Sequence, residues 1–92
     1  MQDLQDLRGF GTLSIGTIQY AGIEYRIFLR EVDGREQAIG VVAGSDEALW
    51  EAFNADGVLL ALEDGRVARV AISLLTAGRA DIRVIGPISP SE

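Results

Sequence analysis

Hydrophobic and polar residues alternate along several short segments of this chain, and glycine-containing pairs separate those segments. The cleanest alternation covers residues 23–32. It places Ile23, Tyr25, Ile27 and Leu29 on one side, and Glu24, Arg26, Phe28 and Arg30 on the other. Because successive side chains of a β-strand point to opposite faces, this segment is predicted to be a strand with one buried side.

The same pattern predicts five further strands, separated by turns or by a helix. They cover residues 11–20, 35–43, the two halves of 58–72 on either side of Asp64-Gly65, and 80–85. The turns fall at Ala21-Gly22, Asp33-Gly34, Asp64-Gly65 and Thr76-Ala77-Gly78. Asp-Gly pairs between apolar runs are strong hairpin signals, because aspartate and glycine tolerate the positive φ angles of tight turns.

One helix is predicted to begin after Ser45. The serine hydroxyl can accept a hydrogen bond from an unpaired N–H of the first turn. The two acidic residues that follow it place negative charge at the positive end of the helix dipole. The apolar side of this helix is predicted to hold Ala48, Leu49, Ala52 and Phe53, with Trp50 at its rim and Glu47, Glu51 and Asn54 opposite.

The resulting order, β-β-β-α-β-β-β, predicts an α+β fold that is mainly β. A small antiparallel six-stranded barrel or a strongly bent sheet with one helix would fit, since closure removes strand edges. At 92 residues the chain has room for one domain. We expect an N-terminal lead-in over 1–9, a small β-barrel-like domain over 10–86 and a flexible C-terminal tail over 87–92.

The hairpin within residues 58–72 differs from an ordinary surface hairpin, because residues 59–62 are all apolar. In a surface hairpin, apolar and polar residues should alternate, so that one face of the hairpin is polar and contacts solvent. Both faces of this hairpin therefore need covering. We expect a second copy of the chain to cover one of them in a twofold homodimer, or another protein to do so.

The turn at Asp64-Gly65 leaves two registers open for this hairpin. A two-residue turn sets Leu60 opposite Arg69, whereas a three-residue turn with a glycine bulge sets Leu59 there. In both registers Arg69 has aliphatic neighbours, so its guanidinium must reach solvent or a carboxylate. The predicted partner-binding surface consists of Leu59, Leu60, Val67 and Arg69.

The composition favours association but does not indicate which molecule the partner is. The chain is 48% hydrophobic, with a mean hydropathy of +0.20. Its longest apolar run, residues 58–62, is far shorter than the about 20 residues that span a bilayer. The N-terminus is acidic, unlike that of a signal peptide. We expect a soluble cytoplasmic protein that contacts no membrane, and the net charge of −6 argues against a nucleic-acid partner.

The chain lacks histidine, cysteine and lysine. This removes Cys/His zinc sites, thiol nucleophiles, Ser-His-Asp triads and Schiff-base chemistry. The adjacent carboxylates Asp46/Glu47 and Glu63/Asp64 fit a helix start and a turn better than an acid–base pair. We therefore expect no catalytic residue, no cofactor and no metal, and the leading hypothesis is a non-catalytic interaction module that self-associates.

The outward row of strand 23–32 supports an alternative function. Arg26, Phe28 and Arg30 place an aromatic ring between two arginines, an arrangement with which sheet and barrel modules stack single-stranded bases. Arg69 and Arg83 would join this row if their strands were neighbours. The alternative hypothesis is therefore a β-barrel that binds a small ligand or single-stranded nucleic acid through Arg26, Phe28 and Arg30.

Overall fold

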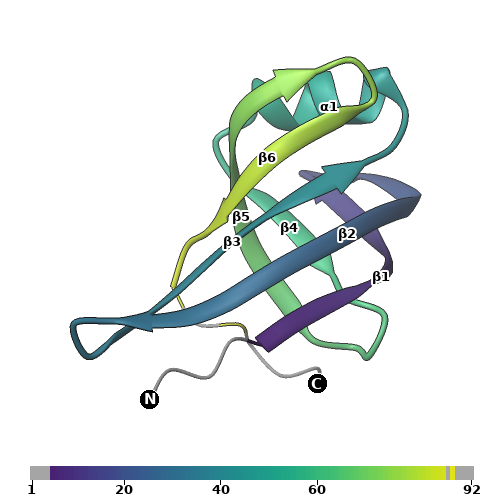
Figure 1. Cartoon of the computed structure of the whole chain (residues 1–92). Coiled ribbons are helices and arrows are strands. Elements are labelled where there is room, and N and C mark those ends of the chain that lie inside the picture. The colour runs from purple at the N-terminus through teal and green to yellow at the C-terminus, as the bar shows by residue number, and fades with distance from the viewer. Residues whose placement is uncertain (1–4, 87, 89–92) are drawn as a thin grey trace.

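Each strand of the chain pairs with two neighbours, and the pairing closes into a six-stranded antiparallel barrel (Figure 1). The computed structural model describes residues 5–86 and Ile88. The elements are β1 (Gln5–Ile15), β2 (Ile18–Val32), β3 (Arg35–Ala43), α1 (Asp46–Phe53), β4 (Val58–Ala61), β5 (Val67–Thr76) and β6 (Arg79–Val84). The predicted element order and the barrel are confirmed.

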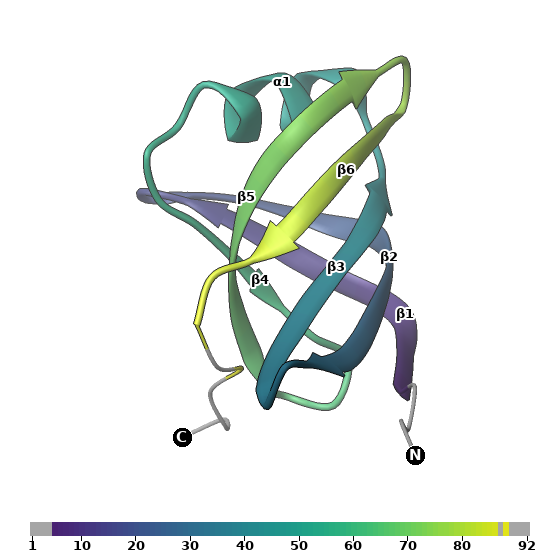
Figure 2. The ribbon, with the colours of Figure 1, turned by 60° about the vertical axis from the view of Figure 1, so that its left-hand side comes forward.

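The strand order around the barrel is β1-β2-β3-β6-β5-β4, and β4 closes the ring against β1. The first three strands form a meander, as do the last three. The pairing of β3 with β6 joins the two meanders on one side, and α1 lies across the upper opening of the barrel (Figures 1 and 2). Closure of this kind leaves few unpaired backbone groups along the barrel strands.

The first hairpin differs from the prediction, because its turn lies at Gly16-Thr17 and not at Ala21-Gly22. Ile15 pairs with Ile18 across this two-residue turn, in which Gly16 has a φ of +63°. The pair Ala21-Gly22 instead forms a bulge inside β2, where the register with β1 shifts and Gly22 has a φ of +74°. Both features use the same property of glycine, which explains the misplaced turn.

The barrel interior is apolar and comes from one side of every strand. In β2 the predicted inward residues are all buried, which confirms the alternation there. Tyr25 is the interior residue with a polar end, and its hydroxyl oxygen accepts a hydrogen bond from the backbone N–H of Glu63 at 2.9 Å. The fully buried large side chains are Leu13, Ile23, Ile27, Val42, Leu49, Leu60 and Ile82.

The helix begins as predicted. The Ser45 hydroxyl oxygen accepts from the backbone N–H of Ala48 at 3.2 Å. Asp46 Oδ1 accepts from the backbone N–H of Gly78 at 2.6 Å, which ties the start of α1 to the β5–β6 turn. Ala48, Leu49 and Ala52 are buried, but Phe53 lies outside the core and this part of the prediction is wrong.

The β4–β5 hairpin adopts the three-residue turn with a glycine bulge. The Leu62 N–H donates to the Arg66 carbonyl at 2.7 Å, and the Gly65 N–H donates to the Leu62 carbonyl at 3.0 Å. Gly65 has a φ of +96°, which a residue with a Cβ adopts only with strain. Leu59 is therefore paired with Arg69.

The β2–β3 hairpin extends past the closed part of the barrel (Figure 1). Pairing of β3 with β6 begins at Ile39, and the described pairing of β1 with β2 ends at Leu29. Residues 30–38 thus form a two-stranded arm around the turn at Asp33-Gly34, where both residues have positive φ as predicted for this turn.

The ends of the chain add little to this arrangement. Residues 5–9 of the expected lead-in belong to β1, and residues 1–4 lie outside the described residues. Of the expected tail over 87–92, only Ile88 is described, and it is half-buried against the core. Within residues 5–86 and 88 there is no helix of the length and apolar character needed to cross a bilayer.

Candidate functional site

Three of the four residues of the predicted partner-binding surface lie together on the outer side of the β4–β5 hairpin. Leu59 faces outward opposite Arg69, and Val67 is half-buried on the same side. Leu60 instead points into the barrel and has no exposed surface, so it belongs to the core and leaves this surface. One side of the apolar run is thus covered by the barrel itself, and the other is not.

A third strand extends this outer surface beyond Arg69. The backbone N–H of Ile85, which follows β6, donates to the carbonyl of Arg69 at 2.8 Å. Leu59, Arg69 and Ile85 therefore form one outward row across β4, β5 and β6. The arginine lies between two large aliphatic side chains.

The next outward row continues the surface onto β3. Arg83 of β6 pairs with Ile39 of β3 on one side and with Ala71 of β5 on the other. We call the five outward residues Leu59, Arg69, Ile85, Arg83 and Ile39 the arginine face. Its aliphatic members keep 44% (Leu59), 45% (Ile85) and 42% (Ile39) of their surface exposed.

The two arginines of the arginine face have no charged partner in the part of the chain that the structure describes. Ion pairs form elsewhere, between Asp6 and both Arg8 and Arg26, and between Asp64 and Arg66. The arginine face is therefore a positively charged, partly apolar surface on a protein whose net charge is −6.

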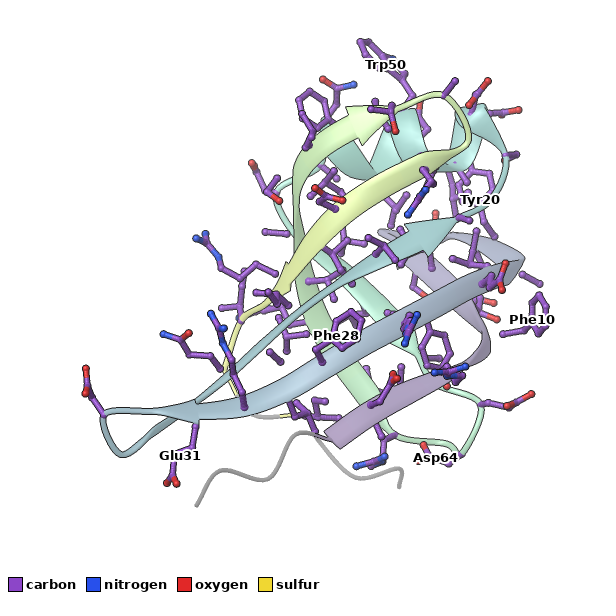
Figure 3. The ribbon with its side chains drawn as sticks, viewed as in Figure 1. Phe10, Tyr20, Phe28, Glu31, Trp50 and Asp64 are labelled. Carbon is purple, nitrogen blue, oxygen red and sulfur yellow. The ribbon has the colours of Figure 1, made fainter. Side chains whose placement is uncertain are left out.

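The alternative site, Arg26, Phe28 and Arg30, lies on the outer side of β2. Figure 3 labels Phe28 on this strand. The guanidinium carbon of Arg26 lies 4.9 Å from the centre of the Phe28 ring, a cation–π contact. Arg26 also donates to Asp6 Oδ2 at 3.2 Å. Phe28 is half-buried, and Arg30 is exposed on the arm.

The Asp6 carboxylate is held by two arginines. Hydrogen bonds from Arg8 and then from Arg26 lower the pKa of Asp6 below its usual range. Asp6 shares one negative charge between Arg8 and Arg26, so the charge of Arg26 is compensated only in part within the chain.

Two adjoining grooves cross the outer side of β2, β3 and β6. The first, of ≈ 390 Å³, is lined by Phe28, Ile39, Gly40, Val41, Ser73, Asp81, Ile82 and Arg83. The second, of ≈ 540 Å³, is lined by Arg8, Gly9, Phe10, Glu24, Tyr25, Arg26, Val41, Val42, Ala43 and Arg79. They meet at Val41, and Arg30 lines neither.

Sequence analysis missed Phe10 and Arg79 as members of this region. Arg79 pairs with Ala43 across β3 and β6, and Phe10 pairs with Glu24 across β1 and β2. Both pairings depend on tertiary register. The signal in the sequence that could have identified Phe10 and Arg79 is an aromatic and a cationic side chain in the strands on either side of β2 and β3. Phe28 of β2, Ile39 of β3 and Arg83 of β6 are paired in one row across these three strands. Arg69 lies on the next strand, β5, and is not part of this row.

A second exposed apolar surface lies on α1. The rings of Trp50 and Phe53 stack with centres 6.2 Å apart, and 56% of Trp50 and 45% of Phe53 is exposed. Trp50 points away from the barrel at the top of the molecule (Figure 3). Partial burial and, after it, the carboxylates of Glu47 and Glu51 raise the pKa of Tyr20.

The described residues contain no group of three or more acidic side chains placed to share a metal ion. The side chains gathered on the surfaces described above can make apolar contacts, aromatic stacking and charge pairs with arginine. Comparison with models of protein families, with curated proteins and with solved structures finds no match to this chain.

Proposed function

We propose that this protein is a non-catalytic interaction module that associates with further copies of itself through the arginine face. The supporting observation is the adjacency of Leu59, Ile85 and Ile39 around two arginines that have no charged partner within residues 5–86 and 88. Interface centres are typically apolar and enriched in arginine, because its planar guanidinium can pack on apolar groups while its N–H groups pair.

Burial of the aliphatic residues would supply part of the affinity. Full burial of one such side chain contributes about 1.5–3 kcal/mol, and these three begin with a little under half of their surface exposed. Their combined burial would stabilise a complex by roughly a few kcal/mol before the cost of association. A micromolar complex requires about 8 kcal/mol, so charge pairs of the two arginines and further contact area would have to supply the rest of the affinity.

The test compares the mass of the protein in solution, measured by sedimentation equilibrium from low to high micromolar concentration, with that of two variants. The double substitution Leu59→Ser and Ile85→Ser is expected to give a monomer. The control Ile18→Ser removes an equally exposed apolar residue beside the β1–β2 turn. It is expected to associate like the wild type.

Two results would overturn this proposal. One is a wild-type protein that stays monomeric at high micromolar concentration. The other is a double serine variant that associates as strongly as the wild type while its melting temperature shows it to be folded.

A second function is favoured by the ≈ 540 Å³ groove, in which Phe10 lies with Arg8, Arg26 and Arg79. We propose, as the alternative, that this groove binds single-stranded nucleic acid by base stacking on exposed Phe10 and by phosphate contacts to Arg79. Stacking on an aromatic side chain contributes about 1–3 kcal/mol per base. Arg79 has no charged partner among the described residues.

The alternative is tested by the fluorescence anisotropy of a labelled oligothymidylate at low salt. The wild type is expected to raise the anisotropy, and Arg26→Glu with Arg79→Glu is expected to abolish the rise. Arg30→Glu, on the arm outside both grooves, is the matched control and should bind almost normally. An unchanged anisotropy with the wild type would exclude this function.

A further inference from the structure

The arginine face has an electrostatic counterpart on the same molecule. Four carboxylates, Asp46, Glu47, Glu51 and Asp56, lie exposed on α1 and the loop that follows it, and no basic residue occurs in that segment. The stacked pair Trp50 and Phe53 is exposed on the same helix. We call the exposed side chains of residues 46–56 the helix surface. It combines aromatic area with negative charge, whereas the arginine face combines aliphatic area with positive charge.

The charges disfavour a twofold dimer in which two arginine faces meet. Such a contact brings Arg69 and Arg83 of one copy toward the same residues of the other, since a twofold interface matches a surface with itself. Like charges brought together in an interface cost several kcal/mol when nothing neutralises them. None of the five residues of the arginine face is acidic, and Asp81, two residues before Arg83 on the outer side of β6, offers one carboxylate against two arginines.

The dimensions of the two surfaces also agree. A helix of eight residues is about 12 Å long. The row of Leu59, Arg69 and Ile85 crosses β4, β5 and the end of β6, and two strand spacings amount to about 10 Å. A helix seated across this row would therefore reach the aliphatic residue at each of its ends.

The two surfaces lie in different places on the barrel. The helix covers the upper opening, whereas β6 runs away from it and ends on the side of the barrel (Figure 2). Ile85 follows the end of β6. One copy can therefore present its helix surface while its arginine face stays open.

We infer that copies of this chain associate head to tail, with the helix surface of one copy seated on the arginine face of the next. Trp50 and Phe53 would cover Leu59 and Ile85, and the helix carboxylates would neutralise the two arginines. A head-to-tail contact leaves one free surface of each kind on every complex. It therefore builds a growing series or a ring, not a closed dimer. This inference depends on the proposed self-association and adds how the copies are arranged relative to one another.

Mixing two variants tests the inference, because a head-to-tail contact uses two different surfaces. The face variant carries Arg69→Glu and Arg83→Glu, and the helix variant carries Trp50→Ala and Phe53→Ala. Each is expected to be monomeric alone. An equimolar mixture should form a complex of two chains, since each variant retains the surface that the other lacks. Sedimentation velocity measures all three samples.

The outcomes separate this inference from the proposed function. If the helix variant still dimerises while the face variant is monomeric, the arginine face mediates a twofold contact and the head-to-tail arrangement is wrong. If the wild type is monomeric, both proposals fail. If the face variant still associates, the arginine face is not the contact surface. Should circular dichroism show a misfolded face variant, Arg69→Gln with Arg83→Gln replaces it under the same criteria.

Trp50 supplies an independent readout, because the chain contains one tryptophan. A head-to-tail contact buries this exposed indole, so its emission should shift to shorter wavelength as the protein concentration rises. Added salt should reverse the shift by screening the charge pairs. An emission maximum that is unchanged across the range in which the mass increases would overturn the inference.

Discussion

The hydroxyl oxygen of Tyr25 accepts a hydrogen bond from the backbone N–H of Glu63 at 2.9 Å, which joins β2 to the β4–β5 turn through the barrel interior. Replacing Tyr25 with phenylalanine keeps the ring and leaves this N–H without its partner. We expect the free energy of unfolding to fall by about 1 kcal/mol, measured by urea denaturation. Tyr20→Phe is the control and should change it little. Equal effects of the two substitutions would contradict this role.

Gly11 permits a close backbone approach between β1 and β4. A Cβ at this position would lie 2.2 Å from the carbonyl oxygen of Ala61. Since backbone atoms cannot move aside as a side chain can, Gly11→Ala is expected to destabilise the protein by about 1–3 kcal/mol. At Gly57 an added Cβ would meet nothing within 4 Å. A thermal melt of Gly57→Ala should therefore match the wild type or exceed it slightly, whereas Gly11→Ala should melt lower.

Asp6 is expected to titrate below the range of a free aspartate, because hydrogen bonds from Arg8 and Arg26 lower its pKa. A pKa lower in the folded than in the unfolded chain stabilises the fold above the unfolded value. That contribution is lost as the pH falls through the folded value. Carboxyl NMR should give this midpoint, and Arg8→Gln should raise it. The control Arg30→Gln should leave the Asp6 midpoint where it is; a similar rise there would exclude a specific contact.

Arg69 lies between two aliphatic residues without a charged partner among the described residues, so its charge adds little to the stability of a single chain. Arg69→Val should pair better with Leu59 and raise the free energy of unfolding by about 0.5 kcal/mol at a concentration where the chain is monomeric. Arg69→Ser removes the charge without adding apolar contact and should give no such gain. Chemical denaturation of both variants compares them, and equal stabilities would contradict the packing argument.

Much of the fold could be predicted because the local signals agree with each other. Alternation identified the inward side of β2, and Asp33-Gly34 and Ser45 marked a turn and a helix start that the structure confirms. The misplaced first turn arose because Gly22 has positive φ in a bulge, which a sequence does not distinguish from a turn. The exposure of Phe53 depends on how far the helix sits over the opening, a tertiary property.

The candidate site was only partly predictable, for a different physical reason. Leu59, Val67 and Arg69 belong to one hairpin, so local register brings them together. Ile39 and Arg83 are far apart in sequence and meet only because β3 pairs with β6. The strand order that creates this contact depends on packing of the whole barrel, and short-range pattern carries no information about it.

The positive φ of Gly65 has a consequence for the surface of the molecule. A hairpin that slips by one residue reverses the orientation of every side chain in the slipped strand. In the other register open to this sequence, Leu60 would face Arg69 and leave the core, and Leu59 would turn inward. One backbone dihedral angle thus selects which of two adjacent leucines is offered to a neighbour. The location of the contact surface is in this sense encoded in a residue that has no side chain.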